Sequence, residues 1–185
     1  MRKYIIIAGV NGVGKSTLYQ SSREMHGMER INTDEIVREI GAWNNFNDVM
    51  TAGKIAVEKI QYNFLNGISF NQETTLCGQM ILNNICKAKE LGYTIEMHYI
   101  SVESVNIAKE RVHMRVQLGG HGIPDSDIER RYIESFVQLN KIIQNIDLLA
   151  LYDNTIAFRR FAIYRNGNIV KISHNCPKWF YDHLI

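Results

Sequence analysis

The sequence predicts an α/β fold with a mainly parallel sheet flanked by helices on both faces, and three observations support this prediction. Short, strongly apolar runs recur along the 185 residues. Between them lie longer segments in which apolar residues return every three or four positions, as along an amphipathic helix. Alternation of this kind forms right-handed βαβ units. The chain also has only two prolines and no Ser/Gly-rich linker, so we expect one domain over residues 1–185.

The first elements follow this alternation. Residues 4–8 (YIIIA) form an uninterrupted apolar run, which is typical of a parallel strand covered on both faces. A glycine-rich turn follows at residues 9–14, and a short helix is predicted over residues 15–22. Residues 30–32 predict a short strand, and residues 34–40 a helix that ends at a glycine.

A longer helix is predicted over residues 48–66, with Asp48 as its N-terminal cap. Its apolar stripe consists of Val49, Ala52, Ala56, Ile60 and Phe64. Residues 69–75 follow as a strand, and residues 79–91 as a helix that ends at Gly92.

The second half of the chain repeats the pattern. Residues 93–100 predict a strand, and residues 103–118 predict a helix. A glycine-rich break at residues 119–124 separates this helix from another over residues 125–145, for which Asp125 is the expected cap.

The C-terminal part is predicted to contain antiparallel strands. Residues 147–152 predict the last parallel strand. Residues 158–172 predict a hairpin around Asn166 and Gly167, a dipeptide that suits a two-residue turn. We therefore expect a hairpin and tail over about residues 156–185.

Residues 9–16 (GVNGVGKS) match the complete phosphate-binding pattern G-x-x-x-x-G-K-[ST]. The motif follows a buried-type strand and opens a helix, which is the context that its mechanism requires. Glycines let the backbone turn tightly and aim its amides inward, and the helix N-terminus adds partial positive charge. The alternative is a glycine turn that only joins strand to helix, but the Lys15–Ser16 pair has no structural need to be there.

The motif predicts a site for ATP or GTP with Mg²⁺. Lys15 is expected to reach the β- and γ-phosphates, the Ser16 hydroxyl to hold Mg²⁺, and Thr17 to lie near the α-phosphate. The predicted nucleotide-binding residues are Gly9, Asn11, Gly12, Val13, Gly14, Lys15, Ser16 and Thr17.

Polar residues also follow two further strands, at the carboxyl ends of the strands, where open parallel sheets bind ligands. Asp34 is the candidate base that takes a proton from an attacking hydroxyl. Alternatively, Thr33 or Asp34 only caps the following helix, and the two roles are compatible. Glu73 and Thr75 are predicted to bind an acceptor with hydroxyl groups, the alternative being a polar exit from the sheet.

Arginines flank the glycine-rich break, and we predict a lid over about residues 111–131. Arg111 and Arg115 lie four residues apart, hence on one helical face, where an anion would relieve their repulsion. Arg130 and Arg131 follow on the next helix. Such residues stabilise the charge of a transferring phosphoryl group, and we assign Lys15, Asp34, Arg111, Arg115 and Arg131 as catalytic.

Other polar residues carry weaker signals. His121 lies between glycines and is a candidate phosphate or substrate contact, or else a surface histidine. Asp153 and Asn154 follow the last parallel strand, where they would aid magnesium and the nucleotide respectively, or simply form a turn. Trp43 and Trp179 are assigned to packing.

Several of these segments together resemble the zeta-toxin-like P-loop kinases. The similarity covers most of residues 4–155 and includes the phosphate-binding motif, the Asn-Thr-Asp step ending at Asp34, and Glu-Thr-Thr at residues 73–75. It also includes the segment RVHMRVQLGGHGIP at residues 111–124, Arg-Arg-Tyr at 130–132 and Tyr-Asp-Asn at 152–154.

The resemblance implies an ATP- or GTP-dependent kinase acting on a small hydroxylated metabolite. By this analogy Lys15 binds phosphate, Ser16 binds magnesium and Asp34 is the base. Characterised toxins phosphorylate UDP-N-acetylglucosamine, so the resemblance implies a nucleotide sugar as one candidate acceptor and an antitoxin-like protein as a candidate partner. Two toxin arginines are replaced here, by Cys77 after the Glu-x-Thr element and by His121 in the lid.

The sequence thus predicts a phosphotransferase that transfers the γ-phosphoryl group of ATP to a small polar acceptor. The alternatives are a nucleotide-hydrolysing regulatory ATPase and a nucleotide-binding module that acts through a protein partner. The formal charge of +2 lacks the basic excess of nucleic-acid binders. No membrane span or signal peptide is visible, and we expect a cytoplasmic protein with no nucleic-acid or membrane partner.

Overall fold

The computed structural model describes residues 1–184. Its strands are β1 (Lys3–Ala8), β2 (Glu29–Ile31), β3 (Phe70–Thr74), β4 (Thr94–Ser101), β5 (Leu148–Asp153), β6 (Arg159–Arg165) and β7 (Asn168–Ile172). They form one sheet in the order β2-β3-β1-β4-β5-β6-β7. The pairs from β2 to β5 are parallel, and the β6–β7 hairpin adds antiparallel strands at one edge. The predicted α/β fold with a C-terminal hairpin is confirmed.

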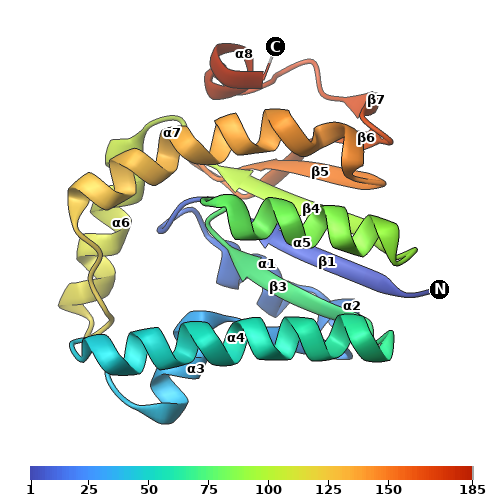
Figure 1. The fold of residues 1–185 in the computed structure, drawn as a ribbon. Helices are drawn as coiled ribbons and strands as arrows, with labels where there is room; N and C mark the ends of the chain where they lie inside the picture. Colours follow the sequence, from blue (N-terminus) through green and yellow to red (C-terminus); the bar gives the residue numbers. More distant parts are fainter. Residues whose placement is uncertain (185) are drawn as a thin grey trace.

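The helices are α1 (Lys15–Ser21), α2 (Arg23–His26), α3 (Thr33–Ile40), α4 (Phe46–Asn66), α5 (Gln79–Glu90), α6 (Val105–Gln117), α7 (Asp125–Ile142) and α8 (Lys178–Leu184). Helices α5 and α7 cover one face of the sheet and α1 and α2 lie behind it, while α6 and the start of α7 extend beyond the carboxyl ends of the strands (Figure 1). Within residues 1–184, no helix combines the length and apolar character needed to cross a membrane.

Strand β1 lies at the centre of the sheet, between β3 and β4. Every side chain from residue 4 to residue 8 is fully buried, which explains why the run is apolar without alternation. The chain leaves this strand at its carboxyl end and enters the glycine-rich turn, so the motif directly follows a central, fully buried strand.

Two predicted helix caps are wrong. Helix α4 begins at Phe46 because the Asn45 side chain accepts a hydrogen bond from the Asn47 amide at 3.0 Å. The Asp48 carboxylate instead accepts the Ala42 amide of the preceding loop. Asp125 is the first residue of α7, where its carboxylate binds the ring of a histidine on α6.

Two helices, α2 and α8, have no counterpart in the predicted elements. Each spans two turns or less, too short to show a periodic apolar stripe, and such helices are stable only through tertiary contacts. In α8 those contacts come from Trp179 and Phe180, both almost completely buried.

Trp179→Ala is expected to lower the free energy of unfolding by about 3–5 kcal/mol, the usual cost of removing a buried tryptophan. The ring is 1% exposed and contacts the rings of Phe136 and Phe161. Its Nε1 also donates to the Asp153 carboxylate at 3.2 Å. Urea unfolding measures the loss, with Tyr181→Ala, at a half-exposed position of α8, as the control. A loss below about 1 kcal/mol would show that α8 is not part of the core.

Candidate active site

The backbone of the phosphate-binding loop is shaped by close contacts that only glycine allows. Gly9 and Gly12 have φ values of 138° and 86°. A Cβ atom on Gly9 would lie 2.2 Å from the carbonyl oxygen of Ile100, and one on Gly12 would lie 2.4 Å from that of Ala108. The backbone of the loop therefore packs directly against the backbones of β4 and α6, with no room for a side chain at either glycine.

Lys15 lies inside this loop. Its Nζ donates to the carbonyl oxygens of Gly9 and Val10, at 2.8 and 3.2 Å, and stands 3.9 Å from the Glu73 carboxylate. Burial lowers the pKa of Lys15, and the nearby carboxylates of Glu73 and Asp34 only partly oppose this. A phosphate entering the loop would supply the counter-charge that the buried ammonium lacks.

A first cavity, of about 390 Å³, opens beside the loop. Its lining comprises Asn11, Gly12, Gly14, Lys15, Ser16, Thr17, Gln20, Asn32, Asp34, Glu35, Arg38, Glu73, Arg111 and Arg115. Most of the predicted nucleotide-binding residues lie on this wall. Gly9 contributes a carbonyl to Lys15, while the Val13 side chain is buried and its carbonyl accepts a hydrogen bond from Asn154 Nδ2 at 2.9 Å.

Two of the predicted lid arginines, Arg111 and Arg115, reach this first cavity from α6. Arg111 donates to the Thr155 carbonyl at 3.1 Å, and Arg115 donates to the His121 carbonyl at 2.9 Å. Nη1 of Arg111 and Nε of Arg115 are buried without a hydrogen-bond partner in the described part of the chain. Each of these two guanidinium groups therefore has one buried donor that the described part of the chain does not satisfy.

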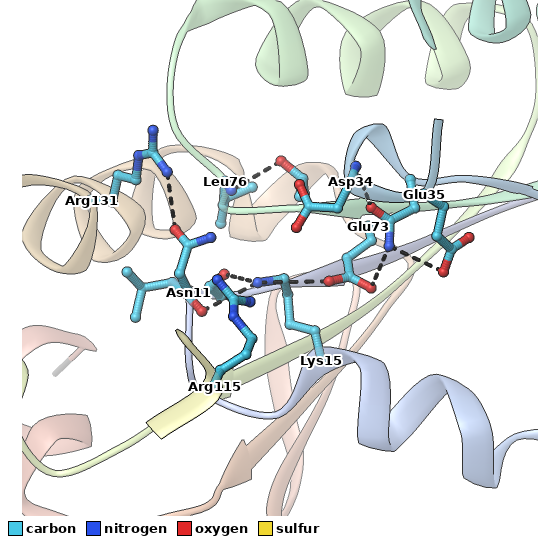
Figure 2. A network of polar contacts seen from close by, with 12 residues as sticks. Asn11, Lys15, Asp34, Glu35, Glu73, Leu76, Arg115 and Arg131 are labelled. Atoms are coloured by element: carbon cyan, nitrogen blue, oxygen red, sulfur yellow. Dashed lines mark hydrogen bonds and ion pairs between the residues drawn. The ribbon is translucent and has the colours of Figure 1, made fainter. Parts of the chain in front are cut away.

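Arg131, the third predicted catalytic arginine, occupies a different place. Its Nη1 donates to the Asn11 side chain at 3.0 Å and so ties α7 to the phosphate-binding loop (Figure 2). Neighbouring Arg130 is exposed and pairs with Asp127 and Glu134. The structure therefore separates the two pairs of arginines onto two sides of the loop.

A second cavity, of about 500 Å³, adjoins the first. It is lined by Asn11, Lys15, Asn32, Thr33, Asp34, Trp43, Gln72, Glu73, Thr74, Thr75, Cys77, Gly78, Ile123, Arg130, Arg131 and Glu134. Five of these residues line both cavities, namely Asn11, Lys15, Asn32, Asp34 and Glu73. The lysine and the candidate base therefore stand at the boundary between the two spaces.

Asp34 is not the cap of its helix, and neither is Thr33. The Asn32 side chain accepts the hydrogen bond from the Asp34 amide at 2.9 Å, which satisfies the start of α3. The Asp34 carboxylate is thereby not used as the helix cap, and the residue lines both cavities with its side chain 32% exposed. The capping interpretation is wrong for this residue, whereas its role as a base stays a prediction.

Glu73 is held by positive charge on two sides. Arg30 donates to its Oε2 at 2.7 Å, Asn32 donates to the same oxygen at 3.2 Å, and Lys15 faces the other oxygen. The side chain is only 10% exposed, and its negative charge is compensated by Arg30 and Lys15 within the site. Thr75, predicted beside it, lies on the wall of the second cavity.

The exposure of His121 and the role of Trp43 differ from the sequence predictions. The His121 ring stacks on Trp43 with centroids 3.9 Å apart, and its Nε2 lies 3.4 Å from Asp34 Oδ2. The His121 side chain is 5% exposed, so it is not a surface histidine. Trp43 packs, as predicted, but it also lines the second cavity, a role that no local pattern indicated.

Asp153 does not face the phosphate-binding loop. Its carboxylate accepts hydrogen bonds from Thr155 Oγ1 and Trp179 Nε1, at 2.6 and 3.2 Å, and lies 3.5 Å from Arg159 Nε. The interpretation as a magnesium-aiding residue is therefore wrong. Asn32 and Arg30, by contrast, organise the site although sequence reasoning missed them, because their partners come from other elements.

Gly12→Ala is expected to cost about 1–3 kcal/mol of stability, because alanine is strained at this φ and its methyl group meets α6 backbone. Affinity for an ATP analogue should fall as the loop is displaced. Urea unfolding and calorimetric titration measure the two effects. Gly53→Ala is the control: it lies inside α4 with no atom within 4 Å of a Cβ, so a gain of about 0.5–1 kcal/mol is expected. Wild-type affinity in Gly12→Ala would contradict the described loop geometry.

Comparison with known proteins gives one clear relative by sequence. No family model matches the chain. A stretch of 130 residues is 32% identical to an uncharacterised protein of Haemophilus influenzae, covering 70% of this chain and 92% of that protein.

Comparison with solved structures gives neighbours by fold. A chain of the AvrRxo1-ORF1:AvrRxo1-ORF2 complex with sulphate ions matches 99% of this chain, with a TM-score of 0.72 and 13% identity. The same complex with ATP gives a TM-score of 0.71 over 92% of this chain at 14% identity. The match covers 63% and 60% of the length of those two neighbouring chains, which is less than two thirds.

A third neighbour comes from the PezAT chromosomal toxin–antitoxin system of Streptococcus pneumoniae, with a TM-score of 0.65 and 13% identity. The match covers 86% of this chain and 70% of that one. The protein thus belongs to the same family as the Haemophilus influenzae protein, and its fold is that of the zeta-toxin-like P-loop kinases.

Proposed function

We propose that this protein is a kinase that transfers the γ-phosphoryl group of ATP or GTP to a hydroxyl group of a small polar acceptor. The observation that carries the proposal is the pair of adjoining cavities, which meet at Lys15 and Asp34. The first surrounds the phosphate-binding loop, and the second, of about 500 Å³, has room for a second substrate. Transfer to water alone would not need that second space.

The residues at the boundary suit an in-line transfer. Lys15 would leave its loop carbonyls and bind the β- and γ-phosphates, while Asp34 accepts the proton of the acceptor hydroxyl. Arg111 and Arg115 line the same cavity, and their positive charge suits the charge on the equatorial oxygens of the phosphoryl group.

Mg²⁺ is part of the proposal, and the donor set fits it. The Ser16 hydroxyl lines the first cavity directly after Lys15, and a hard oxygen donor of this kind suits a magnesium ion that keeps most of its waters. When bound, the ion would neutralise charge on the β- and γ-phosphates.

The wall of the second cavity indicates the chemistry of the acceptor. It combines the hydroxyls of Thr74 and Thr75 with the indole of Trp43 and the guanidinium groups of Arg130 and Arg131. Such a wall suits a hydroxylated metabolite, and a nucleotide sugar is one candidate by analogy with the toxins.

A transfer assay tests the proposal. The protein is incubated with γ-labelled ATP, Mg²⁺ and a cell metabolite extract, and the labelled product is identified by mass. We expect label in a small organic product. Steady release of phosphate that the extract does not accelerate would favour a regulatory ATPase. Nucleotide binding with no turnover would favour a module that acts through a partner.

A protein partner is proposed on the comparisons alone. One structural neighbour was solved as an AvrRxo1-ORF1:AvrRxo1-ORF2 complex, and another belongs to a toxin–antitoxin system. An antitoxin-like partner of this chain would be expected to lower the rate of transfer when added to the assay.

A further inference from the structure

Two loops far apart in the sequence meet beside the candidate base. Trp43 belongs to the connection between α3 and α4, and His121 to the predicted lid connection between α6 and α7. Their rings are nearly parallel, with an interplanar angle of 10° and centroids 3.9 Å apart. Because the imidazole is 5% exposed, this stack fixes the ring in one plane.

The stacked imidazole is also held from the lid side. Arg115 Nη2 donates to the carbonyl oxygen of His121 at 2.9 Å and lies 3.3 Å from its Nε2. The same Nε2 stands 3.4 Å from Asp34 Oδ2. One ring atom thus lies between the arginine that faces the phosphates and the carboxylate that faces the acceptor cavity.

We infer that His121 is a positioning residue for Asp34, and that the Trp43–His121 stack couples closure of the lid to orientation of the base. The inference rests on the proposed kinase function. In the structure Arg115 Nη2 lies at hydrogen-bond distance from Nε2, and Asp34 Oδ2 is in contact at 3.4 Å without a hydrogen bond. In the inferred active state Arg115 keeps its bond to the His121 carbonyl but turns from Nε2 toward the phosphates, and Nε2–H of the neutral ring then donates to Asp34 Oδ2.

This coupling has a chemical consequence. If the lid opens, Arg115 leaves the phosphates and the Asp34 carboxylate loses its hydrogen-bond donor at the same time. A nucleotide bound to the open form would then meet neither the charge stabilisation nor the oriented base, so wasteful transfer to water is suppressed.

Charges around His121 set the direction of a pH effect. Burial lowers its pKa below the ordinary value of about 6.5, Asp34 on α3 raises it, and Arg115 on α6 and Arg38 on α3 lower it further. The imidazole is therefore neutral at pH 7. As pH falls through this pKa, the imidazolium formed beside Asp34 makes the carboxylate a weaker base, so kcat should fall on the acid side.

The decisive variant is His121→Phe, which keeps an aromatic ring on Trp43 but removes Nε2. We expect kcat for transfer from ATP to the metabolite extract to fall by about 10²-fold, as for a slightly misplaced catalytic group, with an unchanged KM for ATP. The fall of kcat below pH 6.5 should also disappear. His174→Phe, at an exposed position, is the matched control and should keep the wild-type kcat and pH profile.

Tryptophan emission tests the stack without turnover, because a protonated imidazole quenches an indole that it touches. The only other tryptophan is the buried Trp179, whose signal is isolated in Trp43→Phe. Wild-type emission should drop as pH falls, with a midpoint below 6.5, and this step should vanish in both His121→Phe and Trp43→Phe.

Each outcome bears on one proposal. If the wild-type protein transfers label and His121→Phe keeps the full kcat, the positioning role is overturned and the kinase proposal stands. The same conclusion follows if the tryptophan emission of the wild-type protein shows no step with pH. A wild-type protein that transfers label to no acceptor would instead remove the proposed function on which this role rests.

Discussion

Lys15→Ala is expected to reduce kcat/KM for phosphoryl transfer by at least about 10²-fold, the usual cost of removing one electrostatic stabiliser of the transition state. The ammonium is the charged group inside the phosphate-binding loop, where it contacts the carbonyls of Gly9 and Val10. In that water-poor position its attraction for a phosphate is stronger than at the surface. Alanine would leave the loop with backbone amides only.

The fold should survive this substitution. Glu73, which faces Lys15, keeps its bonds to Arg30 and Asn32, so no buried carboxylate is left unpaired. Removing a buried ammonium also removes its desolvation cost. Thermal unfolding checks this, and the labelled-ATP assay checks activity, with Lys54→Ala at an exposed position of α4 as the control. Unchanged turnover in a folded Lys15→Ala protein would reject the loop as the nucleotide site.

Asp34→Asn is expected to lower the rate of transfer by about 10²–10⁴-fold, the range for loss of a general base. Asparagine has nearly the same shape but cannot take the proton of the acceptor. Affinity for an ATP analogue should stay near the wild-type value, because the phosphates are held by the loop and Lys15. The drop should therefore appear in kcat.

The local structure makes Asp34→Asn a clean test. Asn32, and not Asp34, caps α3, so the helix start is kept in the variant. Glu39→Gln, which removes an exposed carboxylate from the same helix, is the matched control and should behave as the wild type. Transfer that survives in Asp34→Asn would mean that Asp34 is not the base and that the acceptor loses its proton in another way.

Much of the fold was predictable because its determinants are local. The apolar run at residues 4–8 predicts a central parallel strand, and the β6–β7 turn carries Asn166 and Gly167, both at positive φ. Helices α2 and α8 were not predictable in this way. They are too short for a periodic signal, and α8 is stabilised by contacts of Trp179 with residues far away in the sequence.

The candidate site also has a part that local sequence predicts and a part that depends on contacts between segments. The phosphate-binding motif lies in one segment, so the sequence alone predicts both the loop and the residues on its wall. Asp34, Glu73 and Thr75 were predictable as a group, because carboxyl ends of parallel strands share one edge of the sheet. Their partners were not, since Arg30 and Asn32 on Glu73 are defined by the pairing of β2 with β3.

By itself, the sequence determined the α/β architecture and the phosphate-binding loop, because both depend on the order of residues within short stretches. Only the tertiary structure decided that Arg30 and Asn32 hold Glu73, that Asp153 binds Trp179, and that Trp43 stacks on His121 beside Asp34. These contacts join residues between 26 and 78 positions apart, and no local pattern in the chain predicts which distant residues will meet.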